Sequence, residues 1–170
     1  FLTDNSFIIY AADGGAGRLT MQTSALFKDP SAWYHVVVAM DTTQGTESDR
    51  LNLYINGTQV TDFADITYPT QNRNLIVNTT HYIGTYDTSN NPFHGYLAEF
   101  VYVDGQQLLP TSFGQFDSDS PNIWKPKAVS GLTFGSAGYY LDFATRATDP
   151  IDASGNGNNF SSTNVLAIDH

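Results

Sequence analysis

The sequence predicts an all-β fold arranged as an antiparallel sandwich, and three observations support that prediction. Aromatic residues make up 14% of the 170 residues, and threonine and valine are frequent as well, which is typical of strands. Gly, Asn, Asp and Ser recur between the apolar runs, as the turns of a many-stranded protein require. No segment shows the periodicity of an amphipathic helix for more than about two turns. A chain of this length is expected to form one domain, or one domain with an appendage.

The clearest strand signals lie in the first third of the chain. Residues 7–11 form a short apolar run. Residues 34–40 carry apolar side chains on both faces, which predicts a strand in the middle of the sandwich. In residues 51–55 apolar and polar side chains alternate strictly, and Asn56-Gly57 follows at once. Because both residues tolerate positive φ, this pair predicts a type I′ hairpin turn that leads into residues 58–61.

The pattern is weaker in the rest of the chain. Residues 62–80 are polar and are predicted to form a loop. Further strands are expected over residues 81–86, 95–103, 132–134 and 139–143, with a tight turn at Asp104-Gly105 and an extended loop over residues 145–159. The composition shifts after Pro110, where residues 111–127 become rich in turns. We therefore expect a sandwich over residues 1–110 and a β-rich C-terminal extension over residues 111–170 that packs on the sandwich or follows it.

Charge and composition argue against several classes of partner. The net charge is −10, and the seven basic residues form no cluster along the chain. Nucleic-acid phosphates and anionic membrane surfaces would be repelled, so neither is an expected partner. No apolar stretch approaches the roughly 18 residues of a membrane span, so membrane insertion is not expected. Cysteine is absent, which excludes disulfides and thiolate metal sites.

Four segments in the first two thirds of the chain resemble the laminin-G-like (LamG) branch of the concanavalin A-like lectin and glucanase superfamily. They match its strands in order and spacing: DPSAWYHVVVAMD (residues 29–41), RLNLYINGTQV (50–60), HYIGTY (81–86) and FHGYLAEFVYVDGQQL (93–108). The resemblance implies an antiparallel jelly-roll β-sandwich. It also implies further strands before Phe1, so we expect the sandwich to be N-terminally incomplete, with the missing strands supplied by upstream residues or by a partner.

Three later segments resemble the tail that follows this domain in proteins of marine bacteriophages. They are PTSFGQFDSDSPNIWKPKAVSG (residues 110–131), GYYLDF (138–143) and DASGNGNNF (152–160). Such proteins are usually virion components, often fibres or other surface appendages. The resemblance implies localisation on the virion and partners that are other virion proteins or further copies of this chain. It also implies a glycan of the host surface as the ligand.

The catalytic signature of the superfamily is missing from the sequence. Its retaining glucanases carry Glu-x-Asp-x-x-Glu on one strand, and no such run is present. The chain has two glutamates, of which Glu47 lies in a polar segment and Glu99 in an apolar strand segment. Glu99 is expected to be structural, with a backbone N–H, an arginine or a tyrosine hydroxyl as its partner. We therefore expect no enzymatic activity, because the fold alone does not supply it.

The segment YDTSNNPFH (residues 86–94) is the candidate glycan site. Glycan recognition needs aromatic faces for stacking and amides or carboxylates for the hydroxyl groups, and a loop on a rigid scaffold often supplies both. The candidate residues are Tyr86, Asp87, Asn90, Asn91 and His94. The alternative interpretation is a surface turn that binds nothing.

Calcium is the one cofactor that the sequence leaves open. Ca²⁺ takes six to eight oxygen ligands, and relatives in the LamG branch often bind it at a rim of the sandwich. The candidate ligands are Asp41, Asp117 and Asp119. The alternative is that each aspartate caps the backbone of its own turn. Residues 152–163 begin like an EF-hand, but Thr163 stands where the final glutamate is required, and we reject that motif.

The two tryptophans are assigned structural roles. Trp33 is expected to anchor the core at the start of a strand, and Trp124, between two prolines, to pin the C-terminal extension to the sandwich. Three functions remain open. The first is a non-catalytic recognition module on a virion surface, the second a purely architectural capsid or tail decoration protein with an open strand edge, and the third a polysaccharide depolymerase.

Overall fold

The structure, a computed structural model, describes residues 4–13, 17–74, 80–85, 93, 95–144 and 149–162. In these residues every paired strand is antiparallel, and the helical elements are two single turns of 3₁₀-helix, η1 (Glu47–Asp49) and η2 (Pro110–Ser112). The prediction of an all-β fold is confirmed. None of the described helical turns is long or apolar enough to cross a membrane.

The contacts divide the chain into two compact units. The first contains residues 1–75 and 107–131, and the second contains residues 76–106 and 132–170. The contacts group the segment from residue 107 to 131 with the first strands, and the expected domain division at residue 110 stays a prediction.

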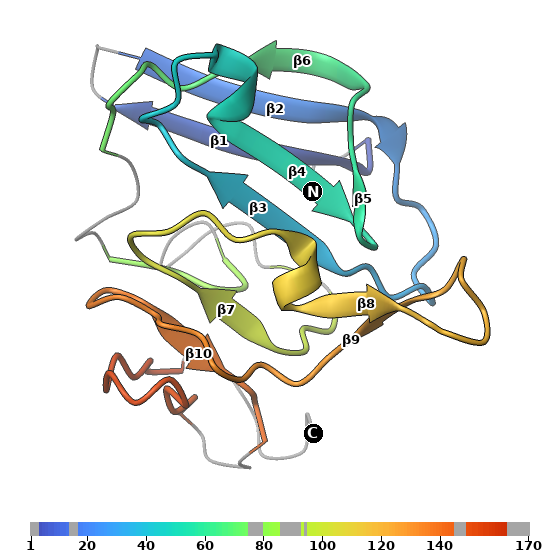
Figure 1. Cartoon of the computed structure of the whole chain (residues 1–170), viewed down its shortest axis with the longest axis vertical. Helices are drawn as coiled ribbons and strands as arrows, with labels where there is room; N and C mark the ends of the chain where they lie inside the picture. The colour runs from blue at the N-terminus through green and yellow to red at the C-terminus, as the bar shows by residue number, and fades with distance from the viewer. Residues whose placement is uncertain are drawn as a thin grey trace. The chain divides into compact units, whose positions relative to one another are not determined.

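The first unit is a sandwich of two three-stranded sheets (Figure 1). One sheet has the order β1-β2-β6, and the other has the order β3-β4-β5. Their bounds are β1 Ser6–Asp13, β2 Gly17–Leu26, β3 Val36–Met40, β4 Leu51–Ile55, β5 Thr58–Gln59 and β6 Phe63–Thr67. Leu19 and Met21 from β2 form one buried cluster with Leu51 and Leu53 from β4, so the two sheets share a core.

Strand β4 forms as its alternation predicts. Leu51 and Leu53 are 1% and 0% exposed, and burial of each leucine contributes about 1.5–3 kcal/mol. The turn after it has positive φ at both residues, 50° at Asn56 and 76° at Gly57, as the type I′ turn requires. The Asn56 side chain also accepts a hydrogen bond from the backbone N–H of His35 at 2.9 Å, which ties the turn to the start of β3. The predicted hairpin is confirmed.

Two predictions for the first unit are wrong. Among the described strands β3 pairs with β4 alone, and β4 is the middle strand of its sheet. The apolar residues of β3 suggested a middle strand, yet Val38 is 42% exposed. Residues 63–67, expected in a loop, form strand β6 on the outer side of β2. Only the first residue of β6 is partly buried, so the strand is held by the backbone of β2 and has no alternation of its own.

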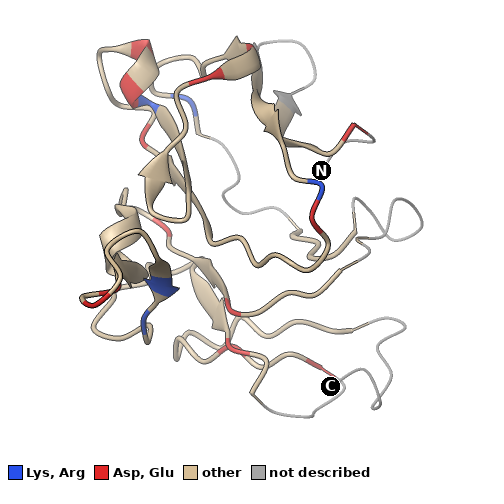
Figure 2. Ribbon diagram, turned by 90° about the vertical axis from the view of Figure 1, so that its right-hand side faces the viewer, with Lys and Arg blue, Asp and Glu red and all other residues tan. Residues whose placement is uncertain are grey.

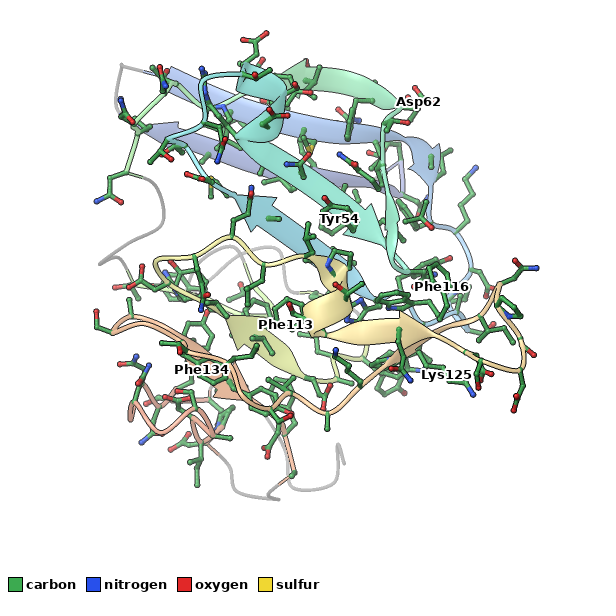
Figure 3. The ribbon with its side chains drawn as sticks, viewed as in Figure 1. Tyr54, Asp62, Phe113, Phe116, Lys125 and Phe134 are labelled. Atoms are coloured by element: carbon green, nitrogen blue, oxygen red, sulfur yellow. The ribbon has the colours of Figure 1, made fainter. Side chains whose placement is uncertain are left out.

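The segment after residue 110 adds a hairpin, β8 (Gly114–Phe116) with β9 (Trp124–Pro126). Figure 3 labels Phe116 and Lys125 on it. The indole of Trp124 lies against Gly57 so closely that an added Cβ would overlap the ring, and it makes an edge contact with Phe116 at 5.0 Å. Trp124 therefore pins this hairpin to the β4–β5 turn, as predicted. Trp33 is 65% exposed, which contradicts its expected role as a core anchor.

The second unit is built around two short strands, β7 (Phe100–Tyr102) and β10 (Tyr139–Leu141), which pair antiparallel. The strand expected over residues 95–103 is shorter because Glu99 has a φ of 53°, which ends the extended backbone. Residues 81–85 and 132–134 are not strands, contrary to expectation. The strand expected over residues 139–143 is confirmed for its first three residues.

Aromatic side chains make the core of the second unit. Tyr139 is 4% exposed, and its ring contacts those of Phe100, Tyr102 and Phe160. Burial raises the pKa of Tyr139 to about 12. On the other face of β10 the Tyr140 hydroxyl donates to the Glu99 carboxylate at 2.9 Å, so a tyrosine hydroxyl is the partner of that glutamate.

The loop after β10 is closed by side-chain hydrogen bonds. Asp152 is 7% exposed, and its carboxylate accepts the N–H groups of Tyr140, Ser154 and Asn158 at 2.8–2.9 Å. The Asn156 and Asn158 amides donate to the Gly138 carbonyl at 2.8 and 2.9 Å. The Asn- and Asp-rich sequence here thus builds a folded loop around one buried carboxylate.

Candidate functional site

The sequence predicts a glycan site in the loop over residues 86–94. Tyr86, Asp87, Asn90, Asn91 and His94 lie outside the described residues, and their role stays a prediction. Of the neighbouring residues that the structure describes, Phe93 donates its backbone N–H to the carbonyl of Gly84 at 2.7 Å. Tyr82 and Tyr96, which flank the segment in the sequence, are 47% and 83% exposed.

Asp41, the first candidate calcium ligand, caps its own turn. Its Oδ1 accepts the backbone N–H of Thr43 at 3.0 Å and the Thr43 hydroxyl at 2.7 Å, and its Oδ2 accepts the amide of Gln44. These hydrogen bonds lower the pKa of Asp41, and the bond from the Thr43 hydroxyl has the largest effect. The carboxylate is surrounded by donors, as the turn interpretation expects.

Asp117 and Asp119 lie together in the β8–β9 hairpin loop. Asp117 Oδ1 accepts the N–H groups of Asp119 and Ser120 at 2.8 and 3.2 Å, and Oδ2 forms an ion pair with Lys125. Asp119 Oδ1 lies 3.5 Å from the Ser118 hydroxyl. Nowhere in the described ranges do three or more His, Asp or Glu side chains converge. Calcium binding stays a prediction, and the geometry of these residues is that of turns.

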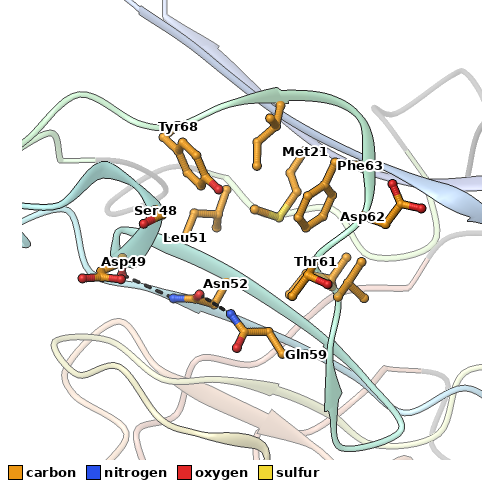
Figure 4. A pocket seen from close by; sticks show the side chains of 13 residues that line it. Met21, Ser48, Asp49, Leu51, Asn52, Gln59, Thr61, Asp62, Phe63 and Tyr68 are labelled. Carbon is orange, nitrogen blue, oxygen red and sulfur yellow. Dashed lines mark hydrogen bonds between the residues drawn. The ribbon is translucent and has the colours of Figure 1, made fainter.

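A pocket that the sequence did not indicate opens at one edge of the sandwich of the first unit (Figure 4). It is open to solvent and has a volume of about 460 Å³. It lies where the chain passes from β5 in one sheet to β6 in the other. Because β5 has two residues, the chain crosses from one sheet to the other over residues 60–62, directly after the hairpin, and the pocket opens beside this crossing. The lining residues are Met21, Ser48, Asp49, Leu51, Asn52, Leu53, Gln59, Val60, Thr61, Asp62, Phe63, Ile66 and Tyr68.

The interior of the pocket is apolar and partly aromatic. Met21, Leu51 and Leu53, which line it, belong to the buried core of the sandwich. Phe63 and Tyr68 are half-buried and pack against the same core. Figure 4 shows both rings on the side of the pocket formed by β6 and the segment that follows it. Met21, Leu51 and Leu53 are at most 1% exposed, so a ligand in the pocket would meet mainly the two aromatic rings that cover them.

Polar side chains form the opposite side. The Gln59 amide donates to Asn52 Oδ1 at 2.8 Å, and the Asn52 amide donates to the backbone carbonyl of Asp49 at 3.3 Å (Figure 4). This chain of hydrogen bonds runs from β5 across β4 to η1 and holds both amides in place. The carboxylates of Asp49 and Asp62 lie at opposite ends of the pocket in the same view, and both residues are exposed.

The pocket is acidic. Its lining contains two carboxylates and no Lys, Arg or His. Arg50, next in sequence to Asp49, donates to the backbone carbonyls of Gln44, Gly45 and Pro69 and so closes the neighbouring loops. Figure 2 shows acidic residues on many of the described loops and few basic ones, in keeping with the net charge of −10.

The pocket contains two carboxyl groups, as hydrolysis of a glycan requires, but their surroundings do not suit that reaction. A glycosidase uses two carboxyl groups on either side of the scissile bond, one of them a buried acid that keeps its proton. Asp49 and Asp62 are both exposed to solvent. Asp62 is engaged as well, since its Oδ1 accepts the Ser24 hydroxyl at 2.9 Å. The arrangement suits binding better than bond cleavage.

The pocket was missed because its residues come from separate parts of the sequence. Asn52 and Gln59 lie in the predicted hairpin, but Phe63 and Tyr68 belong to residues 62–80, which the sequence predicts to form a loop. The one local signal is the presence of these two aromatic residues, separated by Ile66, in a stretch that otherwise contains many polar residues.

The family of the chain follows from a comparison with known protein families. Residues 1–105, well over half of the chain, match the laminin G family model described as concanavalin A-like lectin/glucanases superfamily. The chain belongs to this superfamily. The match includes both sheets of the sandwich and the whole pocket lining. Comparisons with curated proteins and with solved structures gave no match.

Proposed function

We propose that this chain is a non-catalytic recognition module and that the pocket beside β5 and β6 binds a glycan. The observation that carries the proposal is the pairing of two aromatic rings, Phe63 and Tyr68, with two fixed amides, Asn52 and Gln59. Membership of a superfamily of lectins and glucanases supports it.

The chemistry of a sugar ring suits such a lining. The C–H faces of the ring pack on apolar and aromatic surface, and its hydroxyl edge bonds to amides and carboxylates. The volume of about 460 Å³ lies within the usual range of roughly 300–1,000 Å³ for small-molecule sites. Because the pocket is open, much of the ligand stays hydrated, and we expect weak binding that gains strength when several copies act together.

Replacing Gln59 with alanine is expected to weaken glycan binding by about two- to tenfold, the value of one hydrogen bond. Gln59 is exposed, so the substitution should leave the free energy of unfolding almost unchanged. The matched control is Gln115→Ala on β8, an exposed glutamine of the same unit that does not line the pocket. A glycan array would identify a bound oligosaccharide, and calorimetry would give its affinity. Equal losses in both variants would contradict the assignment of the pocket.

The loop over residues 86–94 offers a second place for the same ligand. If it binds the glycan, Tyr86→Ala or Asn91→Ala should reduce affinity by a similar factor, whereas Gln59→Ala should have no effect. Measuring the four variants with one oligosaccharide therefore assigns the site. An array without any binding across bacterial surface polysaccharides would reject glycan recognition altogether.

We further propose that the module is exposed on a phage virion, in a fibre or another appendage. The similarity of residues 110–131, 138–143 and 152–160 to the tails of marine phage proteins supports this location. Mass spectrometry of purified virions, followed by labelling with an antibody against the module, tests it. The protein should be present in intact particles and accessible to the antibody.

A purely architectural role is the second candidate function. It is favoured by β6, which is the outermost strand of its sheet among the described strands and is exposed along four of its five residues. Such an edge can pair with a neighbouring chain. A virion structure with a strand of another protein paired to β6, together with a blank glycan array, would favour this role. Release of reducing ends from a host polysaccharide would instead favour a depolymerase.

A further inference from the structure

The charged groups of the pocket bear on which glycans it accepts. Both carboxylates are at its ends, with the aromatic rings and the amides between them (Figure 4). The hydrogen bonds that the structure gives for Asp49 involve its backbone: its N–H donates to the carbonyl of Thr46, and its carbonyl accepts from the amides of Asn52 and Gln107. Asp62 uses Oδ1 to accept from Ser24. Each end of the pocket therefore presents a carboxylate that a ligand can approach.

Nothing basic offsets these two charges inside the pocket. The lining has no Lys, Arg or His, and the guanidinium of nearby Arg50 is held by three backbone carbonyls. The rest of the chain adds to the negative potential, since its net charge is −10. A ligand with carboxylate, sulfate or phosphate groups would be repelled, and a ligand with an ammonium group would be attracted.

We propose that the pocket discriminates among glycans by charge, preferring amine-bearing sugars to neutral ones and rejecting acidic ones. The inference rests on the proposed function, because it concerns the same pocket. The expected preference is modest. One exposed carboxylate paired with an ammonium group raises the affinity about two- to fivefold. Both carboxylates contribute when the chain of sugars is long enough to reach both ends of the pocket.

The test compares three tetrasaccharides of similar size: tetraglucosamine, tetra-N-acetylglucosamine and tetragalacturonate. Calorimetry is done at about pH 5.5, where aspartates are ionised, and in about 150 mM salt, which screens charges more than roughly 8 Å away. We expect the amine-bearing sugar to bind most tightly, the neutral sugar more weakly and the acidic sugar not at all.

Three variants separate the pocket from the overall charge. Asp49→Asn and Asp62→Asn, combined, should reduce the affinity for tetraglucosamine about four- to twenty-five-fold. The affinity for the neutral sugar should fall by a much smaller factor, because an asparagine amide can still bind a sugar hydroxyl group. Glu47→Gln is the matched control, because it removes one negative charge from the same 3₁₀ turn as Asp49 and lies outside the lining.

The outcomes distinguish the inference from the function on which it rests. If the neutral sugar binds as tightly as the amine, or if Glu47→Gln lowers amine binding as much as Asp49→Asn alone, the inference of charge selection is overturned and glycan recognition stands. If none of the three sugars binds, and no other neutral or amine-bearing glycan does, the proposed function and this inference both fail.

Discussion

Replacing Trp124 with alanine is expected to lower the free energy of unfolding of the first unit by about 3 kcal/mol, toward the lower end of the range for large aromatic residues. The indole fills the space between the hairpin β8–β9 and the turn at Gly57, where even one added carbon would overlap it. Its removal leaves a cavity and releases the hairpin from the sandwich. Urea unfolding followed by far-ultraviolet circular dichroism measures the change.

The second tryptophan supplies the control. Trp33 is 65% exposed, so Trp33→Ala should cost less than about 1 kcal/mol. The same pair can be tested by fluorescence, because a soluble quencher should reduce the emission of the exposed Trp33 more than that of the half-buried Trp124. Equal destabilisation by the two substitutions would contradict the position of Trp124 described above.

The strand β4 and its turn could be predicted because their signals are local. Alternation over five residues decides which side chains face the core, and Asn56-Gly57 fixes the turn by its tolerance of positive φ. Neither signal depends on what lies across the sandwich. Trp124 was also assigned correctly, because a large aromatic residue between prolines in a polar segment must pack on something outside that segment.

The elements that were predicted wrongly depend on distant neighbours. Strand β6 exists because the backbone of β2 is available to it, and its own residues give no period. Strand β3 has apolar residues on both faces, which suggests burial on both sides. Its one described neighbour is β4, and Val38 stays exposed. The strand over 95–103 was overestimated because nothing in the sequence reveals the positive φ of Glu99.

The candidate site was difficult to predict for the same reason, because it also depends on local turn geometry and distant neighbours. Aspartates can be read from a sequence, but whether a carboxylate faces a cation or its own backbone depends on the turn. For Asp41 and Asp117 the two interpretations were open, and the structure places backbone N–H groups around both. Predicting the pocket would require the register of both sheets. Its aromatic side and its amide side meet only because β5 and β6 belong to different sheets.

Replacing Asp152 with alanine is expected to destabilise the second unit by about 3 kcal/mol. Its carboxylate accepts the N–H groups of Tyr140, Ser154 and Asn158, and an unsatisfied buried donor costs about 1–3 kcal/mol. Part of that cost is recovered where water reaches the loop. Asp152→Asn should have an intermediate effect. The amide keeps one acceptor oxygen, but its NH₂ group faces a backbone N–H that is also a donor. Near-ultraviolet circular dichroism follows the change, since the buried tyrosines of this unit absorb there.

The same carboxylate makes the unit sensitive to acid. Burial raises the pKa of Asp152, but the hydrogen bonds from Ser154, Tyr140 and Asn158 outweigh it, so the pKa is below the ordinary value of 3.8. A carboxyl group with a lowered pKa stabilises the fold above its unfolded pKa, and this contribution is lost as the pH falls through the folded one. Stability should therefore decline below about pH 4, and Asp152→Asn should flatten that part of the decline, whereas Asp119→Asn, an exposed aspartate, should not. An unchanged acid profile in Asp152→Asn would show that the carboxylate is not what holds the loop.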